Sequence, residues 1–261
     1  EWPEYNTADA TLWYFQAVHA TLVATGDLDL VRNLYPALQE IVSWHRQGTR
    51  YGIRLDPADG LLRAGEPGTQ LTWMDARVND DGSGEAWVVT PRTGKPVEIN
   101  ALWYNALRAM AEFAERLGKP PESYTALADR AAAGFGRYWN APAGYCYDVI
   151  DGPEGDDPSL RPNQLLAVSL PYSPLSLEQQ RGVVDACARQ LLTSHGLRSL
   201  APDHPDYVGA YGGPVRQRDG AYHQGTVWPW LLGPYAEALM RDHLTRATRI
   251  ISAAPETLFR A

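Results

Sequence analysis

Apolar residues recur at intervals of three and four along most of this 261-residue chain, which is the spacing of helices with one buried face. The first stripe carries Leu12, Ala20 and Val23 and ends near Gly26, a residue type that commonly follows a helix. Further on, Ser176 and Gln179 form the capping-box pattern of a helix start. The spacing predicts helical segments at Thr7–Gly26, from Pro36, at Ile99–Leu117, at Glu122–Trp139, at Asn163–Leu170, after Ser176, at Thr226–Arg241 and at Asp242–Ala254.

Strands are not predicted, because no stretch of useful length alternates between apolar and polar residues. Long connections rich in glycine, proline and aromatic residues separate the helices at 51–98, 140–162 and 197–225. Loops of that length are usually functional. Paired helices with long loops at one rim are typical of an all-α, α/α toroid. An α-solenoid is the alternative, but no repeat of 30–45 residues is present.

Composition limits the functional classes. The length suits one domain over residues 1–261, and the net charge of −8 argues against a nucleic-acid or anionic-membrane surface. The two cysteines, Cys146 and Cys187, form neither a disulfide framework nor a metal-ligand motif, so we expect a reduced, cytoplasmic setting with no metal and no other cofactor. Neither a signal peptide nor an apolar run long enough to span a membrane is recognisable.

Aromatic residues favour a carbohydrate ligand. The chain has 9 Trp and 14 Tyr against only 4 Phe, and indole and phenol rings combine an apolar face with a hydrogen-bonding edge. A pyranose ring needs that combination. Rings on helical stripes are expected to fill helix interfaces: Trp44, Trp103 and Trp139. Rings in the connections are expected to line a cleft: Trp73, Trp87, Tyr211, Tyr222 and Trp228.

Asp75 is the candidate catalytic residue. It ends the run Gln70-Leu71-Thr72-Trp73-Met74-Asp75, and a carboxyl group packed against an indole loses solvation, which favours its protonated form. Glycoside hydrolysis needs such an acid together with a second carboxylate. A cap or turn residue is the structural alternative for Asp75, and a satisfied structural histidine is the alternative for His223. Glu98 precedes a predicted helix, where stabilising the helix dipole competes with binding a sugar.

Several motifs, in order along the chain, together resemble the C-terminal glucosidase domain of glycogen-debranching enzymes, of the amylo-α-1,6-glucosidase type. The resemblance covers roughly residues 3–240 and is carried by Tyr5 to Trp13, Gln70 to Asp75, Val89 to Arg92, Gly94 to Trp103, Arg161 to Gln164, and Gly196 to Trp230.

The resemblance implies a glucoamylase-like (α/α)6 toroid that hydrolyses the α-1,6-linked glucose at branch points of glycogen or a similar α-glucan, with inversion. It implies that Asp75 is the general acid. The residues implied to line the glucose subsite are Asp9, Trp73, Arg92, Glu98, His223 and Trp228.

The chain departs from this family in its helix count, since such a toroid has twelve helices and seven or eight are predicted here. We expect a partial toroid domain over 1–261 that lacks the first and last helices. The general base is expected beyond Ala261, with Glu98 and Asp219 as fallback candidates. Two other functions stay open: a glucan-binding fragment without catalysis, and an inverting sugar phosphorylase on the same toroid.

An incomplete toroid exposes apolar helix faces along its open edge. We therefore predict poor solubility or self-association of the 261-residue chain, measured by light scattering at working concentration. A monodisperse monomer would contradict this prediction.

Overall fold

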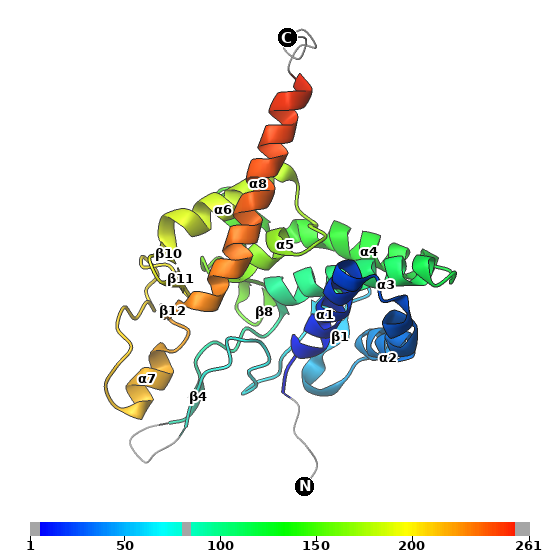
Figure 1. Cartoon of the computed structure of the whole chain (residues 1–261). Helices are drawn as coiled ribbons and strands as arrows, with labels where there is room; N and C mark the ends of the chain where they lie inside the picture. Colours follow the sequence, from blue (N-terminus) through cyan, green and yellow to red (C-terminus); the bar gives the residue numbers. More distant parts are fainter. Residues whose placement is uncertain (1–5, 80–84, 254–261) are drawn as a thin grey trace.

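The computed structural model of this chain describes residues 6–79 and 85–253, with side chains as far as residue 245. Within that part, eight α-helices form most of the regular secondary structure (Figure 1). They are α1 (Ala10–Thr25), α2 (Leu28–Gln47), α3 (Val97–Arg116), α4 (Glu122–Phe135), α5 (Leu166–Ser169), α6 (Leu177–Gln190), α7 (Val215–Ala221) and α8 (Leu232–Ala253). Four 3₁₀ turns accompany them: η1 (Arg50–Gly52), η2 (Gly136–Tyr138), η3 (Pro162–Leu165) and η4 (Pro229–Leu231).

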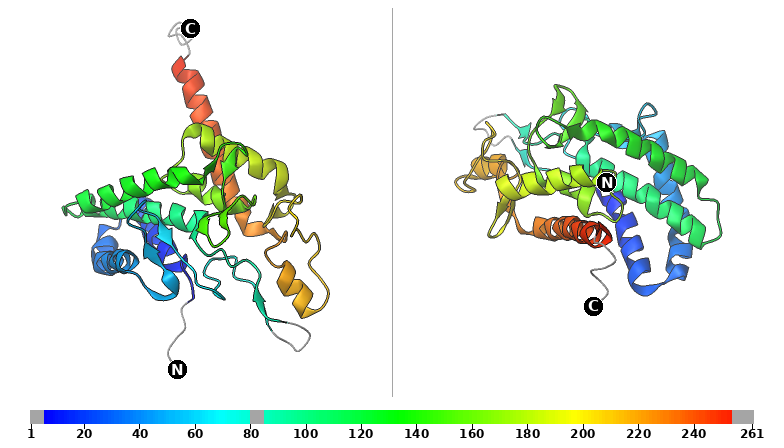
Figure 2. Two further views of the ribbon diagram at one scale, coloured as in Figure 1. Left: turned by 180° about the vertical axis from the view of Figure 1, so that it is seen from behind. Right: turned by 90° about the horizontal axis from the view of Figure 1, so that it is seen from above.

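Helix α3 is the centre of the core. Fifteen of its twenty residues are buried. The other five lie at helical spacing and form one narrow, partly exposed stripe: Tyr104, Arg108, Glu112, Glu115 and Arg116. It packs against α1, α2, α4 and α5, and its Trp103 is fully buried as the sequence predicts. Figure 2 shows α4 beside α3 and α1 and α2 across it. The start of α3 is therefore a fixed point for the loops that meet there.

Several helix ends agree with the sequence. Helix α1 ends at Thr25, and Gly26 follows in the left-handed conformation with φ 71°. Helix α6 begins with the complete Ser176–Gln179 capping box.

Other helical predictions are wrong. Helix α2 begins eight residues before Pro36, because the Asp27 side chain accepts a hydrogen bond from the Leu30 amide and caps the helix there. One continuous helix, α8, replaces the break predicted between Arg241 and Asp242. Helix α7 lies in the 197–225 connection, where the sequence pattern showed no helix. Trp44 is exposed on α2 rather than filling a helix interface.

Short strands, which were not predicted, pair in antiparallel fashion within the long segments between the helices. Each has two to four residues, too few to show an alternating pattern in the sequence. They are β1 (Arg54–Leu55), β2 (Leu62–Arg63), β3 (Arg77–Val78), β4 (Trp87–Val88), β5 (Lys95–Pro96), β6 (Trp139–Asn140), β7 (Tyr145–Cys146), β8 (Val149–Gly152), β9 (Gly155–Asp157), β10 (Leu192–Thr193), β11 (Gly196–Arg198) and β12 (Val227–Trp228).

An apolar groove of about 780 Å³ separates α1 from α8, with the end of α5 at its base. Val23 on α1 and Met240 and Leu244 on α8 line it with largely exposed side chains. The C-terminal half of α8 extends away from the rest of the molecule (Figure 1). The groove is an exposed apolar surface, and self-association through such a surface stays a prediction. No helix of the described part is long and apolar enough to cross a membrane.

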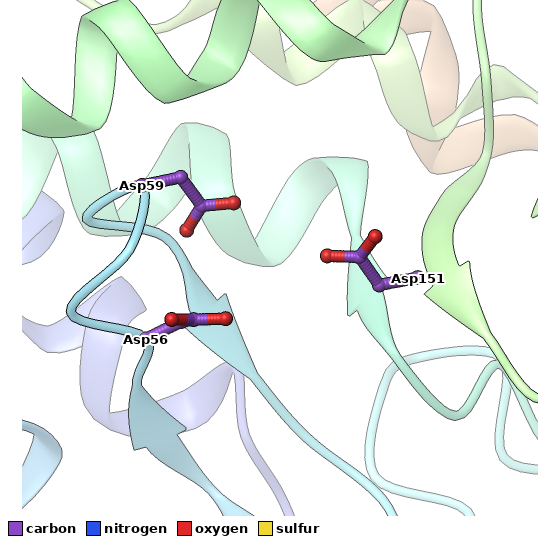
Figure 3. Close-up of side chains that lie close together, drawn as sticks. All are labelled: Asp56, Asp59 and Asp151. Carbon is purple, nitrogen blue, oxygen red and sulfur yellow. The ribbon is translucent and has the colours of Figure 1, made fainter.

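A buried lysine just before α3 joins the connection that precedes this helix to strand β8, which follows α4. The Lys95 ammonium, on β5, lies 2.8 Å from Asp56, 2.7 Å from Asp59 and 2.8 Å from Asp151, and its side chain is 1% exposed. Figure 3 shows the three carboxylates facing a common centre. That centre suits a metal ion by geometry, but the lysine's own charge fills it. Burial opposes the charge on Lys95, yet the carboxylates outweigh it and raise its pKa above the ordinary value.

Replacing this lysine should destabilise the fold strongly. In Lys95→Met the three carboxylates lose their buried cation and keep only the more exposed Arg137, which pairs with Asp59 and Asp151. We therefore expect the free energy of unfolding to fall by about 3 kcal/mol, measured by urea denaturation. The matched control is Lys119→Met, on the surface, which contacts the Tyr35 ring and should cost less than about 1 kcal/mol. Equal stability of the two variants would contradict a structural role for the lysine.

Candidate functional site

Asp75 lies in an extended segment whose side chains alternate between the interior and solvent. Met74, Ala76 and Val78 are buried, whereas Asp75 and Arg77 are exposed. The Thr90 hydroxyl and the Val89 amide hold this segment by donating to the carbonyls of Met74 and Ala76. The Asp75 side chain is 62% exposed, so the predicted loss of solvation against an indole is wrong. An extended backbone points neighbouring side chains to opposite faces, and Met74 takes the inward one.

His223 is the nearest ionisable partner of Asp75. Its Nε2 lies 3.7 Å from Asp75 Oδ1, while the imidazole itself is 1% exposed. Burial lowers the pKa of His223 below its ordinary value, and the Asp75 carboxylate offsets only part of that effect. Neither ring nitrogen has a hydrogen-bond partner among the described residues. A neutral imidazole accepts a hydrogen bond at one nitrogen and donates one at the other, so neutral His223 can pair with Asp75 whether that carboxyl group is ionised or protonated.

Aromatic rings surround this histidine. The Trp228 ring stacks on His223 with centroids 5.2 Å apart and an angle of 14°. Trp73 meets the edges or faces of His223, Trp228 and Trp230 at near right angles, with centroids 5.0–5.6 Å apart. The Nε1 of Trp228 has no partner in the part of the chain described. The half-buried rings of Trp73 and Trp228 therefore lie beside an exposed carboxylate, while the unpaired ring nitrogens of His223 and Trp228 are buried.

A buried ion cluster supports the site from below. The Arg92 guanidinium donates to both oxygens of Glu98, with Nη2 to Oε2 at 2.6 Å, and its Nε donates to Asp148 Oδ2 at 2.6 Å. All three side chains are at most 3% exposed. Burial opposes the charge on Arg92, but Asp148 and Glu98 outweigh it and raise its pKa. Burial raises the pKa of Glu98, and the Arg92 guanidinium works against that rise.

The cluster reaches the aromatic rings through an amide. Asn163 donates from Nδ2 to Asp148 Oδ1 at 2.7 Å, and its Oδ1 accepts from Trp73 Nε1 at 2.7 Å. Arg161, on the same connection, donates to the carbonyl of His223 at 2.7 Å and to that of Ser199 at 3.0 Å. The orientation of Trp73 and the backbone of His223 are thus fixed by buried polar groups.

The structure thus brings four of the predicted residues side by side, with Asp75 on the surface, Trp73 and Trp228 half-buried and His223 buried. Asp9 stands at the start of α1, beside the same segment, because the neighbouring Ala8 amide donates to the Leu71 carbonyl at 2.7 Å.

Arg92 and Glu98 lie elsewhere, beneath that surface and bound to each other. Their predicted direct contact with the sugar needs correction, since both Glu98 oxygens are occupied and its side chain is 1% exposed. Asp219 is on α7, which packs against β3 just after Asp75.

Sequence reasoning missed Thr72, Asp148 and Asn163. The hydroxyl of Thr72 accepts from Arg92 at 3.1 Å, which joins the segment of Asp75 to the ion cluster. The polar motif Arg161-Pro162-Asn163-Gln164 was a usable signal for Asn163. Asp148 is a single aspartate in a long connection, and nothing in its local sequence marks it.

Comparison with protein-family models gives one match across nearly the whole chain. The amylo-alpha-1,6-glucosidase family model matches residues 1–259. The chain belongs to this family. Among curated relatives, the glycogen debranching enzyme of Saccharomyces cerevisiae is 25% identical over 97% of this chain, which spans only 22% of the yeast protein. The family assignment supports glycosidase activity.

Among solved structures, this amylo-alpha-1,6-glucosidase family chain is similar to the GH63 mannosylglycerate hydrolase from Thermus thermophilus. The TM-score is 0.64 at 16% identity, over 88% of this chain and 64% of the hydrolase. At that identity the likeness concerns the fold alone, a helix-rich arrangement of the helical-toroid kind. The prediction of a helix-rich fold of the helical-toroid kind is thereby confirmed.

The buried His223 predicts a pH dependence of stability. Because its pKa is lower in the folded protein than in the unfolded chain, the unfolded chain gains a proton first as pH falls below about 6.5. The stability that neutral His223 supports is therefore complete above that pH and lost below it. We expect His223→Gln to flatten the fall in unfolding free energy between about pH 7 and pH 5, measured by denaturant titration.

The matched control is His195→Gln, since His195 is exposed and should leave the slope unchanged. Burial also lowers the pKa of His45, so part of the slope should remain in His223→Gln. An identical slope in the wild-type protein and His223→Gln would contradict the assignment.

Proposed function

We propose that this chain supplies the catalytic acid of an inverting amylo-α-1,6-glucosidase, which releases the α-1,6-linked glucose at branch points of glycogen-like glucans. The observation that carries the proposal is the exposed Asp75 carboxyl group beside His223, Trp73 and Trp228. Family membership supports the glycosidase chemistry. The name of the yeast relative supports a glycogen-like substrate. We also propose that the chain forms part of an (α/α)6 toroid.

In this mechanism, Asp75 gives its proton to the glycosidic oxygen as the bond to the anomeric carbon breaks. Water adds to that carbon from the opposite face and passes a proton to a second carboxylate, which in inverting enzymes stands about 6.5–9.5 Å from the acid. A sugar that covers Asp75 would remove it from water, which favours the protonated acid before transfer. With its own proton on Nδ1, His223 can accept a hydrogen bond from that protonated carboxyl group.

The glucose unit is held by the groups around the acid. The apolar face of a pyranose fits against the half-buried rings of Trp73 or Trp228, whereas the unpaired nitrogens of His223 and Trp228 are buried and not accessible to its hydroxyls. Asp9 is proposed as a further hydroxyl ligand at the start of α1. Arg92 and Glu98 are proposed to act on the subsite from beneath, by fixing Thr72 and, through Asp148 and Asn163, Trp73.

The second carboxylate is left unassigned. Glu98 is unsuited in this conformation, because Arg92 occupies both of its oxygens away from solvent. Asp219 stays a candidate by its position on α7.

Replacing the acid gives a direct test. In the full-length protein, Asp75→Asn should lower glucose release from a limit dextrin by about 10²–10⁴-fold, since it removes general-acid catalysis. Hydrolysis of α-glucosyl fluoride should fall much less, because fluoride leaves without being protonated. The wild-type enzyme should release β-glucose first, as followed by NMR, because inversion changes the α configuration.

Asp29→Asn is the control, since Asp29 is an exposed aspartate on α2 whose side chain is 85% exposed. Near wild-type release from the dextrin by Asp75→Asn would remove Asp75 from the mechanism. Equal losses on both substrates would assign it a role other than the acid. Phosphate-dependent formation of glucose 1-phosphate would replace the hydrolase with a phosphorylase.

A further inference from the structure

A row of aromatic rings continues from the candidate site toward solvent. Tyr222 lies 4.9 Å from His223 and 5.0 Å from Trp228, measured between ring centroids, and Tyr211 lies 5.8 Å from Tyr222. Burial decreases along this row: His223 is 1% exposed, Tyr222 is half-buried and Tyr211 is 52% exposed. The row therefore leads outward from the imidazole that faces Asp75.

The loop that carries Tyr211 is anchored rather than loose. The Val208 amide donates to the Gln224 carbonyl at 2.6 Å, and the Gln224 side chain accepts from Arg161 at 2.8 Å. Close packing adds to this, because a Cβ on Gly225 would lie 2.5 Å from the Tyr207 ring. The loop is thus anchored three residues before Tyr211, on Gln224, which Arg161 contacts together with the His223 carbonyl.

The two tyrosine rings make an open corner. Their planes meet at 45°, so they do not stack on each other, and the exposed part of Tyr211 is left for a ligand. A phenol ring offers an apolar face for the C–H face of a pyranose and a hydroxyl for its oxygens. The chemistry of this corner fits one neutral sugar ring.

We propose that Tyr211 and Tyr222 form a second pyranose subsite, which binds a glucose unit of the glucan chain that is released as the leaving group. The assignment to the leaving chain rests on the proposed function. When a branch has been reduced to a single glucose, that glucose carries no further sugar on its non-reducing side. Any second sugar unit beside the acid therefore belongs to the chain to which the glucose is attached. The subsite makes the enzyme select glucans over small leaving groups.

The test compares two substrates in the full-length protein. Tyr211→Ala should lower the ratio of kcat/KM for a glucosyl-branched malto-oligosaccharide to kcat/KM for α-glucosyl fluoride by about 2- to 10-fold, the range expected for one lost ring contact. The loss should lie mainly in KM. Tyr211→Phe keeps the ring and should restore most of the ratio. Trp44→Ala, an exposed aromatic on α2, is the control and should leave the ratio unchanged.

A binding measurement separates this inference from the proposed function. Calorimetric titration with linear maltotetraose needs no catalysis, and Tyr211→Ala should weaken it by a similar factor. If the wild-type protein releases no glucose but the variant still loses maltotetraose binding, the proposed function fails and the subsite stands. The subsite is overturned if Tyr211→Ala changes neither the ratio nor maltotetraose binding. It is also overturned if the variant loses kcat/KM equally on both substrates.

Discussion

The Arg92 guanidinium is shared by two buried carboxylates, that of Glu98 at the start of α3 and that of Asp148 just before β8. Burying any one of these charges alone would cost several kcal/mol, so each is tolerated only because the others are present. Arg92 even adopts a left-handed backbone with φ 44°, a conformation that side chains other than glycine's rarely take. The segment of Asp148 is thereby fixed to the connection that leads from Arg92 into α3, at the fully buried start of that helix.

The rest of the site is arranged in layers above that cluster. Asn163 connects the cluster to Trp73, and Thr72 connects it to the segment of Asp75. The Trp73 ring in turn contacts His223. The charged supports are inaccessible, while Asp75 and Tyr211 are exposed. The exposed groups proposed to contact the sugar are therefore accessible to it, while their orientation is set by buried interactions that solvent does not reach.

The sequence pattern located most helices but not all of their limits. A capped start at Asp27 outweighs the interruption by Pro36, and the continuous α8 shows no sequence signal at the predicted break. Strands of two to four residues are too short to give a periodic signal, yet they hold the long connections in register. Asp75 shows the same limit within the site, because the direction of its side chain depends on Met74 filling the interior.

By itself, the sequence determined the all-α class, the family resemblance and the segments that meet at the site, since these depend on local periodicity and ordered motifs. It also identified Asp75, Trp73, His223 and Trp228, which the structure brings together. Only the tertiary structure decided that Arg92 and Glu98 lie beneath the surface and that Asp148 joins them. The reason is physical: a charge is buried only where its partner is also buried, and that partner can come from a segment far away in the sequence.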